Sequence, residues 1–211
     1  MIVSTSFLKE GNYSNFIKKL NETNTDYIHY DVMDGKFVDN TNLKSISELL
    51  KYVELSSKKI DIHLMVENPK KYIEALSLYN INNITIHKEI KNYLDMLNLI
   101  KSYGIKAGIA INPDTDVEEI YDLLDKVDVV LIMSVYPGKS GQKFMQDVTY
   151  KINKLKEIIL EKNLNTQIEV DGGVNEEVLP LITNADIVVS SSYIFEDFSN
   201  IDKIKNYVKY E

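Results

Sequence analysis

The sequence predicts an α/β fold, a single-domain (β/α)₈ TIM barrel that takes up residues 1–211. Two observations lead to this prediction. Short β-branched runs alternate with longer amphipathic runs through eight units, and no linker, low-complexity tract or charge block divides them. The units also lack a nucleotide-binding glycine fingerprint. Eight such units favour a closed parallel barrel over an open sheet, although such a barrel typically has about 250 residues.

Each predicted strand is a short run rich in β-branched residues, and in chain order the eight begin near Ile2, Tyr27, Ile60, Ile84, Lys106, Val129, Gln167 and Ile187. Amphipathic runs predict helices in the gaps, at Tyr13–Leu20, Leu43–Tyr52, Pro69–Leu78, Tyr93–Tyr103, Val117–Leu124, Val148–Leu160, Glu176–Ile182 and Ile201–Val208. Pro69 suits the first turn of the third helix, and Gly104 suits the end of the fourth.

The composition excludes several kinds of chemistry. The chain has no cysteine, so it has no disulfide, thiol nucleophile or thiolate metal site. A net charge of -8 disfavours nucleic acids and anionic membranes as partners. The sequence contains no arginine, so a bound phosphate must be held by backbone N–H groups, helix N-termini, hydroxyls or lysine. With no signal-peptide pattern and no apolar run of about 20 residues, we predict a cytoplasmic protein.

Polar residues whose side chains are able to bind a metal or transfer a proton lie near the ends of predicted strands. They are His29 and Asp31 on the second strand, His63 on the third and Asp171 on the seventh. In this fold the carboxyl ends of the strands carry the active site. Residues two apart on a strand share a face, which groups His29 with Asp31 and Met33, and Asp61 with His63 and Met65. Two histidines and two aspartates suit Zn²⁺, with Mn²⁺, Fe²⁺ or Co²⁺ as alternatives. Hydrogen bonds within the core are the competing interpretation.

Longer segments around these residues resemble the ribulose-phosphate 3-epimerase family. The resemblance rests on Ile28–Val38 (IHYDVMDGKFV), Asp61–Pro69 (DIHLMVENP), Met133–Gly138 with Gly141–Phe144, Val170–Val174 (VDGGV), Ser6 and Ile84–Glu89 (ITIHKE). It runs in the expected order from Ser6 to about Phe195, which is nearly the whole chain.

The resemblance implies an epimerase that converts D-ribulose 5-phosphate to D-xylulose 5-phosphate through an enediolate. It implies that His29, Asp31, His63 and Asp171 bind one divalent metal per chain. Asp31 and Asp171 would also act as the acid/base pair, one on each face of the reacting carbon. His87 matches a family position that is not a ligand, so we expect a structural histidine there.

The same resemblance implies a set of substrate-binding residues: Ser6; a thioether cap of Met33, Met65 and Met133; a flap containing Gly138, Ser140 and Gly141; and a phosphate site formed by Gly172, Gly173, Ser191 and Ser192. The run Ser190–Ser192 is able to open a short helix whose N–H groups point at the phosphate. For the methionines, ordinary core filling is the alternative interpretation. Asp34, before Gly35, is predicted to shape a turn.

Departures from the family pattern leave the substrate open. The usual Pro-Gly-Phe-Gly-Gly-Gln reads Pro-Gly-Lys-Ser-Gly-Gln at 137–142, and Lys36, Asp39 and Ser191 also differ. One alternative substrate is a hexulose 6-phosphate such as D-allulose 6-phosphate. Another alternative is a related barrel that decarboxylates or condenses sugar phosphates, but its Asp-x-Lys-x-x-Asp pattern is missing here. A third is a non-catalytic barrel that binds a phospho-ligand. A homo-oligomer is compatible with the sequence.

Overall fold

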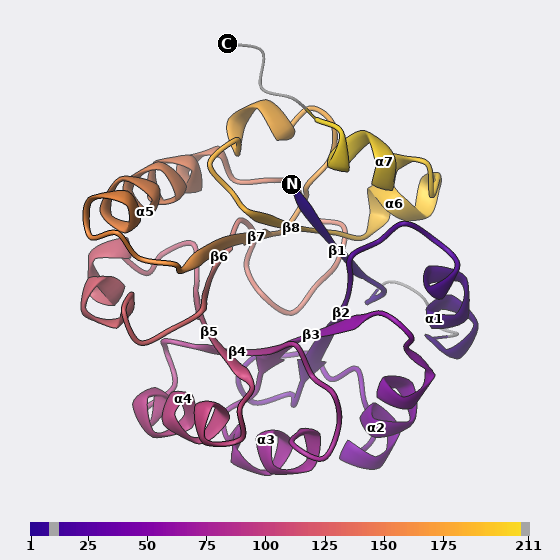
Figure 1. Ribbon diagram of the computed structural model, residues 1–211. Helices are drawn as coiled ribbons and strands as arrows, with labels where there is room; N and C mark the ends of the chain where they lie inside the picture. Colours follow the sequence, from indigo (N-terminus) through magenta and orange to yellow (C-terminus); the bar gives the residue numbers. More distant parts are fainter. Residues whose placement is uncertain (9–12, 208–211) are drawn as a thin grey trace.

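The structure is a computed structural model that describes residues 1–8 and 13–207. Eight parallel strands pair in chain order and close into a barrel, because β1 pairs with both β2 and β8 (Figure 1). The strands are β1 (Ile2–Ser6), β2 (Tyr27–Met33), β3 (Lys59–Met65), β4 (Asn83–His87), β5 (Lys106–Ile111), β6 (Val129–Met133), β7 (Gln167–Asp171) and β8 (Ile187–Ser190). The predicted fold class is therefore confirmed, and each strand begins at or within one residue of its predicted start.

Helices form an outer ring around the barrel (Figure 1). They are α1 (Tyr13–Asn21), α2 (Ile46–Leu55), α3 (Lys70–Leu76), α4 (Tyr93–Ser102), η1 (Val117–Leu123), η2 (Gln146–Val148), α5 (Thr149–Glu161), η3 (Leu179–Leu181), α6 (Ser192–Glu196) and α7 (Asn200–Lys205), where η marks a 3₁₀ helix. Among the described helices, none combines the length and the apolar character needed to cross a membrane. The last predicted helix reaches Val208, which lies outside the described residues.

Two of the predicted helical segments form 3₁₀ helices and not α-helices. The segment predicted at Val117–Leu124 is the 3₁₀ helix η1, whose buried residues Val117, Ile120 and Leu123 recur every three positions. That spacing places them on one face of a three-residue turn, whereas an α-helix has 3.6 residues per turn.

The segment predicted at Glu176–Ile182 contains only the short 3₁₀ helix η3. The Asn175 side chain accepts hydrogen bonds from the Glu177 and Val178 N–H groups, and Pro180 has no N–H of its own. Both features favour a turn over a helix interior.

The helix α2 begins three residues later than predicted because of a local cap. The Ser45 side chain accepts a hydrogen bond from the Glu48 N–H, and the Glu48 carboxylate accepts one from the Lys44 N–H. Such side-chain bonds satisfy N–H groups that the first helical turn leaves unpaired, and they fix where the helix starts. The predicted end of α4 is confirmed, since Gly104 follows it with φ of +74° and donates to the Lys101 carbonyl.

Alternation along the strands separates two kinds of interior. On β2, Ile28, Tyr30 and Val32 join the apolar core between the sheet and the helices. The intervening His29 and Asp31 therefore face into the barrel, because successive side chains of a strand point to opposite faces. The barrel interior is accordingly polar in its middle, whereas the layer between sheet and helices is apolar.

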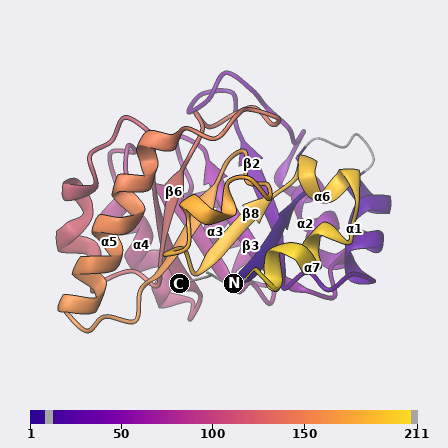
Figure 2. The ribbon, with the colours of Figure 1, turned by 90° about the horizontal axis from the view of Figure 1, so that it is seen from above.

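The loops at the carboxyl ends of the strands all lie at one end of the barrel. Figure 2 shows the loops after β2 and β6 rising at the end opposite the N-terminus. These two loops touch, since the Asn40 side chain donates to the Gly138 carbonyl at 3.0 Å and Val38 packs against Gly138. Together they form part of the rim above the barrel interior.

Candidate metal and catalytic site

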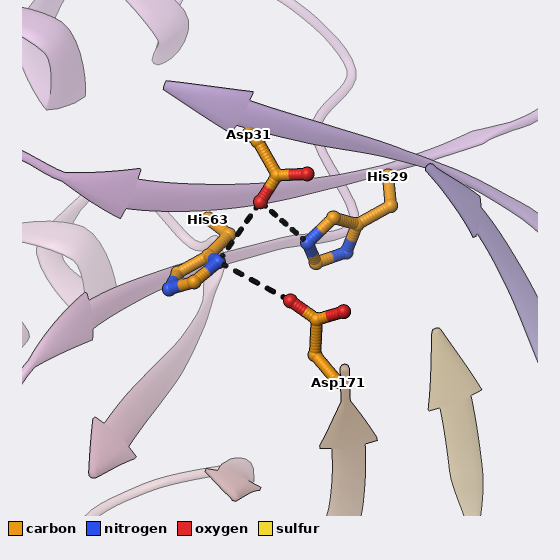
Figure 3. A group of neighbouring side chains, drawn as sticks. All are labelled: His29, Asp31, His63 and Asp171. Carbon is orange, nitrogen blue, oxygen red and sulfur yellow. Dashed lines mark hydrogen bonds and ion pairs between the residues drawn. The ribbon is translucent and has the colours of Figure 1, made fainter. Parts of the chain in front are cut away.

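Four side chains from three strands converge inside the carboxyl end of the barrel (Figure 3). The His63 Nδ1 atom lies 3.1 Å from the Asp31 Oδ1 atom and 3.9 Å from the Asp171 Oδ2 atom. The His29 Nε2 atom lies 3.4 Å from the Asp31 Oδ1 atom. Each residue offers one nitrogen or oxygen atom, and all four atoms lie within 4.8 Å of one another. This group could hold one metal ion, as the sequence predicts.

Strand register brings these residues together although they are distant in sequence. The pairing of β2 with β3 sets His29 beside Asp61, Asp31 beside His63 and Met33 beside Met65. On the opposite wall of the barrel, β6 and β7 pair Met133 with Asp171 (compare Figure 3). Asp171 therefore faces Asp31 across the interior, with the two imidazoles between them.

The two aspartates differ in their proton affinity. Burial alone would raise the pKa of Asp31, but the His29 and His63 imidazoles lower it well below its ordinary value. Burial and the nearby Asp31 carboxylate instead raise the pKa of Asp171 from 3.8 to about 7. A carboxylate beside cationic or hydrogen-bonding partners stays ionised, whereas one facing a like charge keeps its proton. The pair thus holds one ready base and one ready acid.

His29 is fully buried between two carboxylates. Its Nδ1 atom lies 2.6 Å from the Asp61 Oδ2 atom, while its Nε2 atom has no hydrogen-bond partner. Burial by itself lowers the pKa of His29, but Asp61 and Asp31 raise it well above 6.5. An unsatisfied buried nitrogen is costly, and a metal ion among the four ligand atoms would satisfy it.

A cavity of about 510 Å³ opens above the four side chains and reaches the rim loops. Asp31 and Asp171 line it, whereas His29 and His63 lie beneath its floor. All the substrate-binding residues predicted from the sequence line it too: Ser6, Met33, Met65, Met133, Gly138, Ser140, Gly141, Gly172, Gly173, Ser191 and Ser192. The structure therefore brings the whole predicted set to one cavity.

The three methionines each end a strand and are 2% exposed. Met33 and Met65 pack with Val38, and Met133 packs with Ala110, Leu131 and Val135. They form an apolar layer at the mouth of the polar interior, so they fill space and face the cavity at once.

Glycines after β7 let the loop after β6 come close. A side chain at Gly173 would place its Cβ atom 2.5 Å from the Phe144 backbone nitrogen, and one at Gly172 would lie 2.6 Å from Val135. Both glycines also have φ values of +122° (Gly172) and +65° (Gly173), which favour a residue without a side chain. The Ser134 hydroxyl donates to the Asp171 and Gly172 carbonyls and fixes the end of β7.

His87 and Asp34, which were predicted from the sequence to have structural roles, both make hydrogen bonds within the protein. The His87 Nε2 atom lies 2.8 Å from the His63 Nε2 atom, and the His87 Nδ1 atom lies 3.1 Å from Glu89. Burial lowers the pKa of His87 to about 4, so it is neutral near pH 7. Asp34 accepts hydrogen bonds from the Lys36, Phe37 and Glu67 N–H groups, which confirms its predicted role in shaping the loop.

A polar layer beneath the site was not predicted. Asp61 accepts hydrogen bonds from Ser4 and Asn83 in addition to His29, and Glu169 lies beside it, fully buried. Burial, and then the charge of Asp61, raise the pKa of Glu169 well above its ordinary value, so Glu169 is protonated. The available signal was strand alternation: Asp61 precedes His63 by two residues, and Glu169 precedes Asp171 by two.

Solved structures share the fold at low sequence identity. A structure of Mycobacterium tuberculosis tryptophan synthase superimposes with a TM-score of 0.69 at 13% identity, over 97% of this chain and 88% of that one. Phosphoribosyl anthranilate isomerase from Thermococcus kodakaraensis superimposes with a TM-score of 0.63 at 14% identity, over 98% of this chain and 99% of that one. At such identities the likeness shows the barrel fold alone.

Sequence relatives are much more similar. A protein of Helicobacter pylori (strain J99) named ribulose-phosphate 3-epimerase is 44% identical over 177 residues, which is 82% of this chain and 81% of that protein. A protein of Bacillus subtilis (strain 168) with the same name is 39% identical over 199 residues, which is 92% of this chain and 89% of that protein. The profile of the Ribulose-phosphate 3 epimerase family matches residues 2–195. A match of this extent shows that the chain is an epimerase belonging to the ribulose-phosphate 3-epimerase family.

Proposed function

We propose that this epimerase converts D-ribulose 5-phosphate to D-xylulose 5-phosphate by inverting C3, with Asp31 and Asp171 as the acid/base pair. One observation carries the proposal most directly. Two carboxylates face each other across the floor of one cavity, and their surroundings shift their pKa values in opposite directions. Inversion at a carbon next to a ketone needs a base on one face and an acid on the other, which is what such a pair supplies.

In the proposed reaction, Asp31 and Asp171 remove and return a proton on opposite faces of C3. Asp31, ionised and held by a 2.8 Å hydrogen bond from the Ser6 hydroxyl, takes the C3 proton of one epimer. Asp171, whose pKa burial and the Asp31 charge raise to about 7 in the metal-free site, returns a proton to the opposite face. For the other epimer the two residues exchange roles, because the reverse reaction must use the same path. The opposite pKa shifts therefore support a two-base scheme with one acidic and one basic member.

The four converging side chains fit one divalent metal per chain. His29 would give its unpartnered Nε2 atom, His63 its Nδ1 atom, and Asp31 and Asp171 one carboxylate oxygen each. A set of two imidazoles and two carboxylates suits Zn²⁺, and also Mn²⁺, Fe²⁺ or Co²⁺. When bound, such an ion supplies Lewis-acid stabilisation of the negative charge that develops on the substrate oxygens.

The remaining cavity walls suit a sugar phosphate. Met33, Met65 and Met133 present uncharged sulfur that offers no proton to an electron-rich intermediate. Gly172 and Gly173 after β7 line the same cavity, together with the hydroxyl residues Ser191 and Ser192 after β8. We assign the phosphate to this part of the cavity, since loops after the seventh and eighth strands are a recurrent phosphate site in barrels.

A solvent-deuterium experiment tests the reaction and the substrate together. The enzyme is incubated in D₂O with D-ribulose 5-phosphate or with D-allulose 6-phosphate, and deuterium at C3 is followed by NMR. We expect exchange at C3 and accumulation of the C3 epimer with the pentulose phosphate. Faster exchange with the hexulose phosphate would show that the preferred substrate is the hexulose phosphate, while the proposed mechanism would stand. Absence of exchange with both would contradict the proposed reaction.

A further inference from the structure

The nitrogen of His63 that faces away from the site belongs to a buried chain of hydrogen bonds. The His63 Nε2 atom lies 2.8 Å from the Nε2 atom of His87, and the His87 Nδ1 atom lies 3.1 Å from the Oε2 atom of Glu89. The side chains of His63 and His87 have no exposed surface, and that of Glu89 is 25% exposed. On this side of His63 the direction of each hydrogen bond is set within the chain of three residues, whereas the His63 Nδ1 atom faces Asp31.

The direction follows from Glu89. Its other oxygen, Oε1, accepts hydrogen bonds from the Asn112 N–H at 2.9 Å and from the Thr115 hydroxyl. An ionised carboxylate only accepts, so the His87 Nδ1 atom must carry the hydrogen. A neutral imidazole has one N–H group, so the His87 Nε2 atom must accept. The hydrogen between the two rings therefore belongs to the His63 Nε2 atom. The His63 Nδ1 atom, which lies 3.1 Å from the Asp31 Oδ1 atom, is the nitrogen left to face a metal ion.

We propose that Glu89 and His87 are positioning residues that hold His63 in the tautomer able to bind metal through its Nδ1 atom. The inference rests on the proposed function, in which the Nδ1 atom of His63 is a metal ligand. The other ligand histidine is held separately, since His29 directs its Nδ1 atom at Asp61 and leaves its Nε2 atom for the metal. Carboxylates that orient ligand histidines in this way are a common part of metal sites, and their loss typically weakens metal binding about 10- to 100-fold.

Replacing Glu89 by glutamine reverses the hydrogen-bond direction without changing the shape of the side chain. The Asn112 N–H is a donor only, so the new amide must turn its oxygen toward it. Its NH₂ group then faces the His87 Nδ1 atom, which has to accept. His87 would carry its hydrogen on Nε2, pointing at the His63 Nε2 atom, and this favours the His63 tautomer with hydrogen on Nδ1. That hydrogen occupies the position of the metal.

We call the chain of hydrogen bonds from Glu89 through His87 to His63 the relay. Comparison of Glu89→Gln with Glu89→Ala distinguishes this relay from a merely structural role of Glu89. Both remove the charge of Glu89, but alanine leaves the His87 Nδ1 atom free to bond with water in either direction. The relay predicts that Zn²⁺ binds about 10- to 100-fold more weakly to Glu89→Gln than to the wild type, with Glu89→Ala between them. A structural role predicts the opposite order, because the alanine variant loses more contacts. Affinities are measured by competition with a chromophoric chelator.

The matched control is Glu119→Gln. Glu119 is an exposed carboxylate that pairs with Lys88, next to Glu89 in sequence, and it does not touch the relay. The same chemical change there should leave the Zn²⁺ affinity unchanged. Thermal unfolding of each metal-free variant shows whether it is folded. A folded Glu89→Gln protein that binds Zn²⁺ as tightly as the wild type, or more tightly than Glu89→Ala, would overturn the relay.

The chain has three histidines, which makes a direct spectroscopic readout practical. In ¹⁵N-histidine-labelled protein, long-range ¹H–¹⁵N correlations report which ring nitrogen carries the hydrogen. We expect His87 as the Nδ1–H tautomer in the wild type, with or without Zn²⁺, and as the Nε2–H tautomer in Glu89→Gln. The His29 signals, which depend on Asp61, should stay the same in both and serve as an internal reference. A wild-type His87 with its hydrogen on Nε2 would refute the proposed direction.

These readouts keep the relay distinct from the proposed function. If the wild type binds no metal while His87 shows the expected tautomer and its reversal in Glu89→Gln, the hydrogen-bond direction is right and the metal-dependent function is wrong. If the wild type binds metal and epimerises but the affinity order is that of a structural role, the function stands and the relay falls.

Discussion

The two carboxylates of the site, Asp31 and Asp171, differ in what lies next to them. Asp31 accepts a hydrogen bond from Ser6 and lies beside two imidazoles, whereas Asp171 ends β7 and faces the charge of Asp31. The same functional group therefore favours the ionised form in one case and the protonated form in the other when no metal is bound. The difference comes from neighbours contributed by three separate strands, β1, β2 and β3.

Neutral substitutions test the two-base scheme. Asp31→Asn and Asp171→Asn should each lower kcat for epimerisation by at least about 10²-fold, the low end for loss of a general acid or base. Because both residues are also proposed ligands, metal content is measured for each variant and rates are compared per metal-loaded site. Asp125→Asn, at an exposed aspartate, is the control that should keep wild-type rates. Wild-type turnover in either site variant would contradict the scheme.

Metal affinity should rise with pH because the metal competes with protons. The metal-free site holds protons on Asp171 up to a pKa of about 7 and on His29 to a pKa well above 6.5. Each displaced proton weakens binding by up to about tenfold per pH unit below the pKa of its group. Titration calorimetry between about pH 6 and about pH 8 should show tighter binding and less proton release as pH rises. The slope should fall in Asp171→Asn, and a pH-independent affinity in the wild type would contradict the prediction.

The raised pKa of Asp171 also affects the stability of the metal-free protein. A carboxyl group whose pKa is raised on folding stabilises the folded state below its unfolded pKa, ordinarily 3.8. This contribution is lost as the pH rises through the folded pKa of about 7. The two aspartates therefore oppose each other, since the lowered pKa of Asp31 contributes stability above its ordinary value and loses it in acid.

Among the elements, the loop after β6 departs most from the family pattern. Residues 137–142 line the cavity, and the Gln142 side chain ties the loop to itself by donating to the Tyr136 and Lys139 carbonyls. Within the described part of the chain, the Lys139 ammonium group makes no hydrogen bond or ion pair. In a chain without arginine, this cation on the cavity wall is available to the substrate.

Substitution of Lys139 tests which sugar this loop accommodates. Lys139→Phe restores the residue usual in the family and removes the charge. A desolvated lysine that bonds the substrate contributes about 1.5–3 kcal/mol, so we expect kcat/KM to fall by about 10- to 150-fold for the preferred sugar phosphate. Both pentulose 5-phosphate and hexulose 6-phosphate are assayed, and a loss confined to one identifies it. Lys162→Ala, at an exposed lysine outside the cavity, is the control. Unchanged constants would show that Lys139 is merely a solvated surface residue.

For the whole molecule, the site joins strands that are far apart in the chain. The proposed ligands from β2, β3 and β7 meet inside a closed sheet, so a bound ion would link the two walls of the barrel. Anything that binds the folded state alone stabilises it by an amount that grows with the logarithm of its concentration relative to Kd. The proposed metal should therefore contribute to the stability of the entire barrel as well as to catalysis.

Metal removal should lower both activity and stability. At a metal concentration about 100 times Kd the expected gain is about 2.7 kcal/mol, which for a domain of this size corresponds to a Tm increase of about 5–11 °C. Chelator-treated protein should unfold at the lower temperature and be inactive, and Zn²⁺, Mn²⁺ or Co²⁺ should restore both. Elemental analysis should find about one ion per chain. Full activity in protein shown to be metal-free would contradict the site.

The sequence by itself determined the repeating pattern and the residue types. Alternation on β2 and β3 set His29, Asp31, Asp61 and His63 on the inner face, because side-chain direction in a strand depends only on local geometry. The order of the eight units determined the fold class. The family resemblance supplied the four proposed ligands and the cavity residues, all of which the structure brings to one place.

Only the tertiary structure decided what lies next to what. The opposite pKa shifts of Asp31 and Asp171 depend on closure of the barrel, which sets β7 across from β2. The segment at Val117–Leu123 forms a 3₁₀ helix, with Val117, Ile120 and Leu123 buried, although its sequence pattern indicated only a helix. The partners of Glu89 come from two places, since one carboxylate oxygen faces His87 and the other accepts a hydrogen bond from Asn112 in another loop. Proton affinity and hydrogen-bond direction are set by neighbours in space, and a linear sequence does not list those neighbours.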